Sequence, residues 1–95
     1  MRVRFNRGAL ADIDGIAAYI AERNPRAAAE LIERFEAVAN LLGQSPEIGA
    51  RTERPNLRKF VAGSYLLVYE ITATEIVIHY VRHGARLRPW DSTQD

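Results

Sequence analysis

The sequence predicts an α+β fold, with an antiparallel helix hairpin packed on one face of a small, mostly antiparallel sheet in the order β-α-α-β-β-β. Three observations predict it. The chain has 95 residues, which is room for one core, so residues 1–95 are expected to form a single domain. Two apolar periodicities of helical spacing follow one another in the first half. Three strand-like segments with short links fill the second half.

The chain is expected to begin with a short strand followed by a helix. Residues 2–5 alternate charged and apolar side chains, which is typical of a half-buried strand. Residues 7–22 are then expected to be helical, with Asn6 as the N-cap and with Asp12 and Asp14 near the positive end of the helix dipole. The apolar residues expected to face the core are Val3, Phe5, Leu10, Ile13, Ile16, Ala17 and Ile20.

A second helix follows after a tight connection. Asn24 is a favoured cap and Pro25 is tolerated at the first helical position, so one helix ends and the next begins there. Residues 26–42 keep one apolar face for more than four turns, and Gly43 stands where a left-handed C-cap is expected. The residues of this face are Ala28, Leu31, Ile32, Phe35, Val38, Ala39 and Leu42.

The second half is expected to be a loop followed by an antiparallel meander. Residues 43–56 are turn formers and charges with Ile48 as the one apolar anchor, which indicates a loop. Residues 57–61, 65–71 and 75–83 are strand-like and are separated by links of only three residues. Consecutive strands with such short links pair with one another.

The last predicted strand breaks its own alternation. Ile76 and Ile78 share one face, but the next aliphatic candidate for that face, Val81, comes three residues later. Either a β-bulge lies near His79 and Tyr80, or both faces are buried there. The bulge is the favoured interpretation.

Composition excludes several classes of protein. The absence of cysteine excludes disulfides and thiolate metal sites and fits a reducing cytoplasm, which is the expected location. No apolar run reaches the ~18–20 residues that cross a bilayer, and no phosphate-loop, dinucleotide or hydrolase motif is present. On a strand, His79 and His83 would lie about 13 Å apart, too far for one ion. We therefore expect no metal, no cofactor and no membrane partner.

The formal net charge of +1 conceals a segregation of charge along the chain. The 13 basic residues are 12 arginines and one lysine. Residues 9–43 hold six acids against three arginines, residues 51–68 hold four basic residues against one acid, and residues 79–90 hold three arginines and no acid. Since arginine binds carboxylates and phosphates and stacks on bases, this pattern points to an acidic partner or a nucleic acid. A solvated charged surface is the alternative.

Aromatic residues accompany these arginines. Tyr65, Tyr69 and Tyr80 lie on the predicted strands and Trp90 follows them, as in a site that stacks single-stranded RNA. Such aromatic residues equally suit the packing of a small sheet. This packing role is favoured for Tyr65 and Tyr69, because residues four apart on a strand lie on the same face of the sheet. His83 can be an acid–base group or a hydrogen-bonded structural residue, and the structural role is favoured.

In their order and spacing, several short patterns resemble the ParE branch of the ParE/RelE toxin superfamily over nearly the full length. They are Ala9-x-x-Asp12-x-x-x-Ile16-x-x-Tyr19-Ile20, Pro46-x-x-Gly49, Leu57-Arg58-Lys59-Phe60, Gly63-x-Tyr65-x-x-x-Tyr69 and Ile76-x-Ile78-x-x-Val81-x-His83-Gly84-Ala85-Arg86. The resemblance implies a plasmid-stabilisation toxin of a type II toxin–antitoxin module, with the corresponding fold, bound by a cognate antitoxin.

The resemblance implies two alternative activities. ParE-like members poison DNA gyrase, whereas RelE-like members cut mRNA on the ribosome with basic residues and a Tyr or His. The single lysine and the absence of a tyrosine after residue 80 depart from the nuclease pattern, so gyrase poisoning by binding, without catalysis, is favoured. If the protein is RelE-like, the catalytic candidates are Arg58, Arg82 and His83. A non-toxic binding module is a third interpretation.

The expected partner is a ParD-like antitoxin whose acidic C-terminal segment folds on the basic sheet, giving a hetero-oligomer. DNA gyrase is the second expected partner, and the antitoxin would block its access. The predicted partner-binding residues are Arg58, Lys59, Tyr65, Arg82, His83, Arg86 and Trp90.

Overall fold

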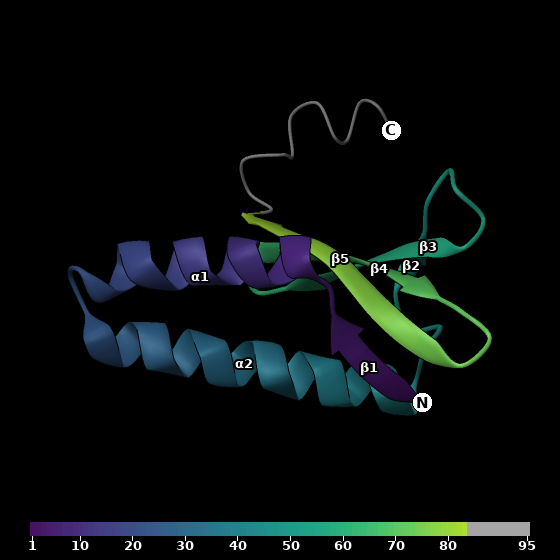
Figure 1. The fold of residues 1–95 in the computed structure, drawn as a ribbon, viewed down its shortest axis with the longest axis horizontal. Helices are drawn as coiled ribbons and strands as arrows, with labels where there is room; N and C mark the ends of the chain where they lie inside the picture. Colours follow the sequence, from purple (N-terminus) through teal and green to yellow (C-terminus); the bar gives the residue numbers. More distant parts are fainter. Residues whose placement is uncertain (84–95) are drawn as a thin grey trace.

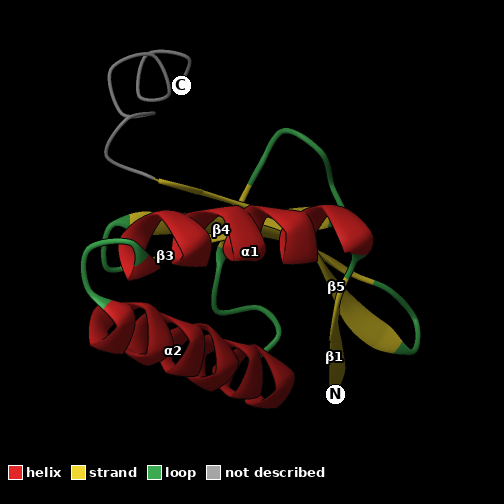
Figure 2. Ribbon diagram, turned by 60° about the vertical axis from the view of Figure 1, so that its left-hand side comes forward, coloured by secondary structure: helices red, strands yellow, loops and turns green. Residues whose placement is uncertain are grey.

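Two helices lie together on one face of a five-stranded sheet in a computed structural model that describes residues 1–83 (Figures 1 and 2). Helix α1 spans Arg7–Ala21 and helix α2 spans Pro25–Gln44. They run antiparallel, as the short connection between them predicts, and no helix of residues 1–83 lies on the other face of the sheet (Figure 2). The predicted α+β class and element order are confirmed.

The sheet has the strand order β1-β5-β4-β3-β2. Its strands are β1 (Arg2–Phe5), β2 (Ala50–Arg51), β3 (Leu57–Ala62), β4 (Tyr65–Ile71) and β5 (Glu75–His83). Strand β1 pairs with β5 in parallel, and all other pairs are antiparallel. Strand β2 falls inside the segment predicted to be only a loop. Its two residues had no strand-like pattern of their own and pair because β3 offers an edge.

The predicted bulge in the last strand is confirmed. Tyr69 pairs with Ile78 and Val68 pairs with Tyr80, so His79 is the extra residue on β5. This extra residue restores Val81 to the helix side of the sheet, where it is 2% exposed.

Both predicted N-caps are present. The side chain of Asn6 accepts a hydrogen bond from the Ala9 amide, and that of Asn24 accepts one from Ala27, with Pro25 at the first helical position. Each cap satisfies an amide that the helix leaves without a partner. The caps therefore fix where each helix begins.

The core lies between the helices and the sheet, and it differs from the prediction at Leu10. Leu10 is 50% exposed, while its neighbour Ala9 is fully buried. A Cβ on Gly8 would lie 3.3 Å from the His79 carbonyl oxygen, so the first turn of α1 approaches β5 closely. Small residues fit that approach and a leucine does not. The buried cluster also includes Ile13, Leu31, Phe35, Val38, Leu42, Leu67, Tyr69, Ile76, Ile78 and Val81.

Two predictions about the region after α2 are wrong. Gly43 does not form a left-handed cap, because it lies within α2, and the one described residue with positive φ is Gly63. A Cβ on Gly43 would lie 2.7 Å from the Met1 carbonyl oxygen, so this glycine permits β1 to approach the helix. Ile48 is not an apolar anchor, since it is 47% exposed. Among residues 1–83, no helix is long and apolar enough to cross a membrane.

Candidate partner-binding surface

Arg58 and Lys59, the basic pair of β3, point to opposite faces of the sheet. Arg58 pairs with Tyr69, whose side chain belongs to the core on the helix side, and Lys59 pairs with Val68 on the helix-free face. They cannot contribute to one flat basic surface. Of the two, only Lys59 lies on the face away from the helices.

Arg58 is already engaged within the chain. Its Nη1 donates hydrogen bonds to the carbonyl oxygens of Glu47, at 3.2 Å, and Gly49, at 2.8 Å. The Tyr69 hydroxyl donates to the Pro46 carbonyl at 2.7 Å and accepts from the Gly49 amide at 2.9 Å. Burial raises the pKa of Tyr69, which keeps the hydroxyl protonated as a donor. We call this set of four contacts the loop latch.

Gly49 is the residue that the loop latch requires. A Cβ at this position would lie 2.6 Å from the Tyr69 hydroxyl and 2.8 Å from the Lys59 carbonyl oxygen. The sequence pattern singled out Pro46 and Gly49 by their spacing without a role. The structure gives both a role, because they supply a carbonyl and an amide to the same tyrosine hydroxyl.

Arg82 lies on β5, across β4 from the strand that carries the loop latch. Its Nη1 donates to Asp12 Oδ2 at 3.0 Å, and its guanidinium lies 4.5 Å from the centre of the Tyr80 ring. The same Oδ2 accepts a hydrogen bond from the Val81 amide at 2.9 Å. Asp12 was expected only to favour the positive end of its helix. Its carboxylate instead accepts a hydrogen bond from the Val81 amide of β5, beyond the point where β1 pairs with β5.

Tyr65 and His83 form an aromatic row with Phe35 of α2. The ring centres of Phe35 and Tyr65 are 5.6 Å apart, and those of Tyr65 and His83 are 5.2 Å apart, both edge to face. Tyr65 packs against the core and His83 is exposed at the end of the row. The packing interpretation therefore holds for Tyr65 and Tyr69, and only Tyr80 of the strand tyrosines is exposed.

The three nuclease candidates do not converge. Arg58 and His83 pair with β4 residues that are four positions apart, Tyr69 and Tyr65, which is about 13 Å along the strand. They also lie two strands apart, and Arg82 points to the face opposite its neighbour His83. Arg86 and Trp90, the other predicted contact residues, lie outside the described residues.

Sequence reasoning missed a polar network around the bulge residue His79. Its Nε2 lies 2.8 Å from Glu70 Oε1, and its Nδ1 lies 3.2 Å from the side-chain nitrogen of Asn6. Because the Asn6 oxygen is committed to the helix cap, its nitrogen donates to Nδ1, and the proton of neutral His79 sits on Nε2. The hydrogen bond from His79 lowers the pKa of Glu70. The bulge in the sequence pattern was the only signal for this network.

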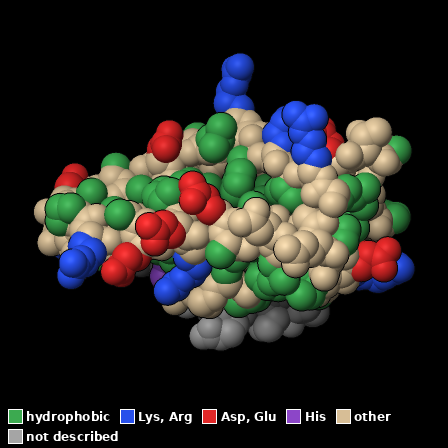
Figure 3. Space-filling view, turned by 90° about the horizontal axis from the view of Figure 1, so that it is seen from below, with side chains coloured by type: hydrophobic (Ala, Val, Ile, Leu, Met, Phe, Trp, Pro, Cys, Tyr) green, Lys and Arg blue, Asp and Glu red, His purple; other side chains and the backbone are tan. Residues whose placement is uncertain are grey.

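Charge is segregated in space as well as along the chain. Most acidic side chains in view lie over the helical part of the molecule (Figure 3). Lys59 lies on the face away from the helices, as do Val61 and Tyr80, whose side chains are 64% and 36% exposed. Arg82 joins them at the β5 edge, where its guanidinium bridges the Tyr80 ring and Asp12 of α1. We call these four residues the open-face patch. Within residues 1–83, no three acidic or histidine side chains are grouped so that they could hold a metal ion.

The profile of a known family covers nearly all of the chain. Residues 3–88 match the family described as ParE toxin of type II toxin-antitoxin system, parDE. The chain belongs to the ParE toxin family. No curated protein matches it.

Solved structures agree with this assignment at the level of the fold. The ParE-family chain is similar to a chain of the chromosomal ParDE TA system from P. aeruginosa, with 22% identity and a TM-score of 0.75 over 87% of this chain and 95% of that one. It is also similar to a chain of the toxin–antitoxin complex RelBE2 from Mycobacterium tuberculosis. That match has 28% identity and a TM-score of 0.58 over 86% of this chain and 88% of the other.

Proposed function

We propose that this ParE-family toxin inhibits growth by binding DNA gyrase and trapping its cleaved complex with DNA, and that a ParD-like antitoxin neutralises it. The family match over residues 3–88 supports the toxin class. The similar chain from P. aeruginosa comes from a ParDE system, which supports an antitoxin as partner. The toxin would then act in the cytoplasm, and its inactive form would be a hetero-oligomer with the antitoxin.

The observation that carries the choice of binding over catalysis is the dispersal of the nuclease candidates. General acid–base cleavage of RNA needs its groups within hydrogen-bond reach of one phosphate. Arg58 is engaged by the loop latch, and Arg82 and His83 point to opposite faces. A surface that acts by contact has no such requirement, so the geometry favours a poison that binds its target.

The antitoxin contact that we propose centres on the open-face patch. An acidic segment can pair its carboxylates with Lys59 and Arg82 while its apolar side chains cover Val61 and Tyr80. The arginine is already oriented by Asp12 and Tyr80, which lowers the entropy lost on binding. The acidic helices on the other side of the molecule would repel such a segment and fix its orientation.

Ribosome-dependent mRNA cleavage is the second candidate. It is favoured by the similarity to a chain of RelBE2. In this case His83 would exchange protons and Arg82 would hold the phosphate, which requires Arg82 to leave Asp12 and reach the side of the sheet on which His83 lies. A non-toxic binding module with the same patch is the third.

One pair of assays separates the three candidates. Expression without antitoxin arrests growth for either toxin and has no effect for a non-toxic module. Purified gyrase with supercoiled DNA and this protein should accumulate linear DNA after denaturation, and antitoxin should prevent it. Absence of linear DNA together with new mRNA cuts on translating ribosomes would establish the nuclease instead.

The antitoxin contact has its own matched pair of variants. Lys59→Glu reverses a charge in the open-face patch, whereas Arg26→Glu reverses one on an exposed turn of α2. We expect the first to weaken antitoxin binding about tenfold and the second to leave it unchanged. Equal affinity of both variants would remove the patch from the proposal without affecting the toxin assignment.

A further inference from the structure

A basic loop leads from β2 to β3 at one edge of the sheet. We give this name to residues 51–56, in which Arg51 and Arg54 are both exposed. Within residues 1–83, neither guanidinium forms an ion pair, although Glu53 lies between them in the sequence. The loop lies at the opposite end of the molecule from the turn between α1 and α2 (Figure 1). It therefore presents two free arginines far from that turn.

Hydrogen bonds hold the shape of the basic loop. The Thr52 hydroxyl accepts from the Arg54 amide and lies 3.1 Å from the carbonyl oxygens of Arg54 and Leu57. The Leu57 amide donates to the Arg54 carbonyl, which closes a turn with Pro55 and Asn56 at its centre. The Asn56 side chain ties this turn to β4. Because the backbone is already ordered, the arginines lose less entropy when they bind a ligand.

Strand pairing places Arg51 directly opposite Arg58. Residues opposed in this way lie on the same face of the sheet with Cβ atoms about 4.5–5.5 Å apart, and like charges at such positions are destabilising. Arg58 is turned to the carbonyl oxygens of Glu47 and Gly49 in the loop latch. Arg51 has no such partner within the described chain. An anion bound at Arg51 would remove the repulsion between the two arginines.

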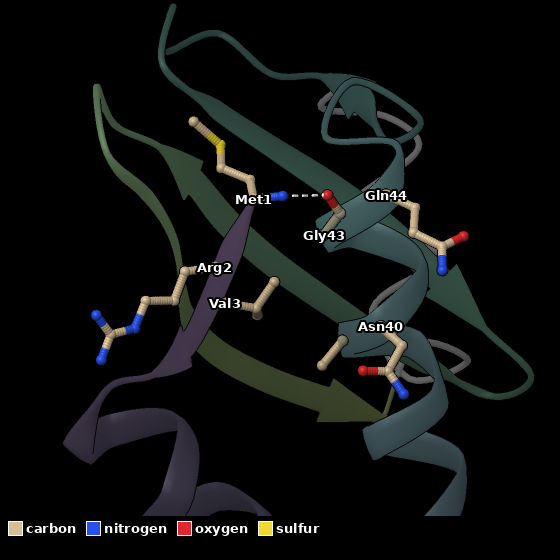
Figure 4. A pocket seen from close by; sticks show the side chains of 7 residues that line it. Met1, Arg2, Val3, Asn40, Gly43 and Gln44 are labelled. Atoms are coloured by element: carbon tan, nitrogen blue, oxygen red, sulfur yellow. Dashed lines mark hydrogen bonds between the residues drawn. The ribbon is translucent and has the colours of Figure 1, made fainter.

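The arginines of β1 are arranged differently. Arg4 pairs with Glu75 at 3.0 Å, and this hydrogen bond, with a smaller effect of Arg2, lowers the pKa of Glu75. Arg2 also lines a cavity of about 510 Å³ between β1 and the last turns of α2, but its side chain points away from α2 (Figure 4). At that cavity the Met1 nitrogen donates to the Gly43 carbonyl. Strand β1 therefore has no pair of free arginines like that of the basic loop.

The chemistry of the basic loop suits phosphate better than it suits a protein surface. Between residues 50 and 59 no large apolar side chain is exposed, whereas protein interfaces centre on apolar and aromatic residues. Contacts to a DNA backbone need no apolar centre, because arginine binds phosphate oxygens through parallel N–H groups and releases counterions. Most acidic side chains in view lie over the helical part of the molecule (Figure 3), so they would repel DNA there and not at the loop.

We propose that Arg51 and Arg54 bind the phosphate backbone of the DNA that gyrase holds in the cleaved complex. The inference rests on the proposed function, because it adds a DNA contact to the contact with gyrase. A ligand traps one state only when it binds that state more tightly than the others. A toxin that touches both gyrase and its DNA binds their complex more tightly than gyrase alone, since the second contact is intramolecular. The contact is independent of base sequence.

The first test measures how binding to DNA depends on salt. The full chain is titrated into a short labelled DNA duplex at several salt concentrations, and fluorescence anisotropy gives the affinity. The double variant Arg51→Gln, Arg54→Gln should lower the slope of log affinity against log salt by about 1.8, because each phosphate contact contributes about 0.9. The matched control Arg23→Gln, Arg26→Gln removes the same charge from exposed positions at the turn between α1 and α2 and should keep the wild-type slope.

The second test uses gyrase and supercoiled DNA. We expect about tenfold more of the Arg51→Gln, Arg54→Gln protein to be needed for the same amount of linear DNA, and no such change for the control. Binding to gyrase in the absence of DNA, and binding to antitoxin, should equal those of the wild type. These two affinities show that the variant is folded and that only the contact with DNA is lost.

Arg51→Gln alone has a further signature in the free protein. Removing one of two opposed like charges should raise the urea concentration at the midpoint of unfolding, while Arg26→Gln leaves it unchanged. A side chain that only supported the fold would have the opposite effect. A midpoint that is not raised by Arg51→Gln would overturn the argument for an anion at this position, and the inference with it.

The outcomes distinguish this inference from the proposed function. If wild type and the Arg51→Gln, Arg54→Gln protein give equal linear DNA, the basic loop does not contact the DNA and the gyrase assignment stands. If these arginines bind an RNA of the same length more tightly than the DNA duplex, the inference is overturned. If the wild type gives no linear DNA with gyrase, the proposed function fails and this inference fails with it.

Discussion

The two edges of the sheet are finished in different ways. At the β3 edge, the chain closes the sheet with its own loop, through β2 and the four contacts of the loop latch. At the β1 edge, β1 covers β5 only as far as Ile78, and a single carboxylate of Asp12 meets the Val81 amide beyond it. An edge closed by buried contacts maintains the fold and holds the basic loop in place, whereas an edge completed by one carboxylate contributes less to stability.

The contacts at the two edges also differ in kind. The hydroxyl of Tyr69 is neutral and belongs to a fully buried side chain, whereas the Arg82–Asp12 pair has side chains that are 49% and 27% exposed. Solvent screens exposed ion pairs, which contribute about 0–1 kcal/mol. An unsatisfied buried polar group costs about 1–3 kcal/mol. The free energy of unfolding should therefore depend mainly on the β3 edge.

Gly49→Ala is expected to have the largest effect on that comparison. The added methyl would lie 2.8 Å from the Lys59 carbonyl oxygen and displace the Tyr69 hydroxyl, so overpacking and lost hydrogen bonds together cost about 3 kcal/mol. Gly15→Ala is the control, because nothing lies within 4 Å of its added methyl, and we expect a gain of about 0.5–1 kcal/mol. Urea unfolding measures both, and equal effects would contradict the latch.

Tyr69→Phe tests the hydroxyl alone and should cost about 2 kcal/mol, because the Gly49 amide and the Pro46 carbonyl lose their partner. Its pKa is raised in the folded state, so its contribution is complete below about pH 10 and is lost as pH rises through the folded pKa. The variant should lack this alkaline loss. Tyr19→Phe, on an exposed side chain, should retain it, and parallel alkaline profiles of the two variants would disprove the assignment.

What the sequence predicted was local, and what it missed is mostly a contact between distant segments. Periodicity and caps located β1, both helices, three strands and the bulge, because each depends on neighbours within a few residues. The loop latch joins Pro46 to Tyr69, and Asp12 meets Arg82 seventy residues later. No pattern within one segment contains such pairs. The prediction that Leu10 faces the core was wrong for the same reason, since its exposure depends on how closely Gly8 approaches His79.

The candidate site was predictable in residue type but not in arrangement. Arginine bias and aromatic neighbours pointed to the basic residues of β3 and β5. Side-chain parity alone then separates Arg58 from Lys59, once the pairing of β3 with β4 is known. The cavity beside β1 had no signal in the sequence, because its walls are main-chain groups and small residues.

Asp12→Ala tests the β1 edge and is expected to have a smaller effect than either latch variant. It leaves the Val81 amide without its acceptor and Arg82 without its partner, at a cost of about 1 kcal/mol. Asp12→Asn keeps an oxygen for the Val81 amide and removes only the charge, so it should cost less than half as much. If both variants lost equal stability, the ion pair, and not the edge amide, would be the important contact.

Glu70→Gln should change the free energy of unfolding least, and the change should appear in how that free energy depends on pH. The pKa of Glu70 is lowered by the His79 hydrogen bond, so its contribution is present above the unfolded pKa of about 4.5 and is lost as pH falls through the folded value. We expect the variant to have a flatter stability profile below pH 4.5. Glu33→Gln, on an exposed face of α2, removes the same charge and is the control for the change in net charge.

The same polar network connects the bulge residue His79 to the first turn of α1 through Asn6. Neutral His79 accepts from the Asn6 nitrogen, but a protonated ring would present a second donor to it, and Asn6 cannot turn because its oxygen caps Ala9. Asn6→Asp keeps the cap oxygen and replaces the donor to Nδ1 with an acceptor, so the ¹⁵N chemical shift of His79 Nδ1, measured by NMR, should change. An unchanged Nδ1 chemical shift would show that Asn6 does not set the tautomer.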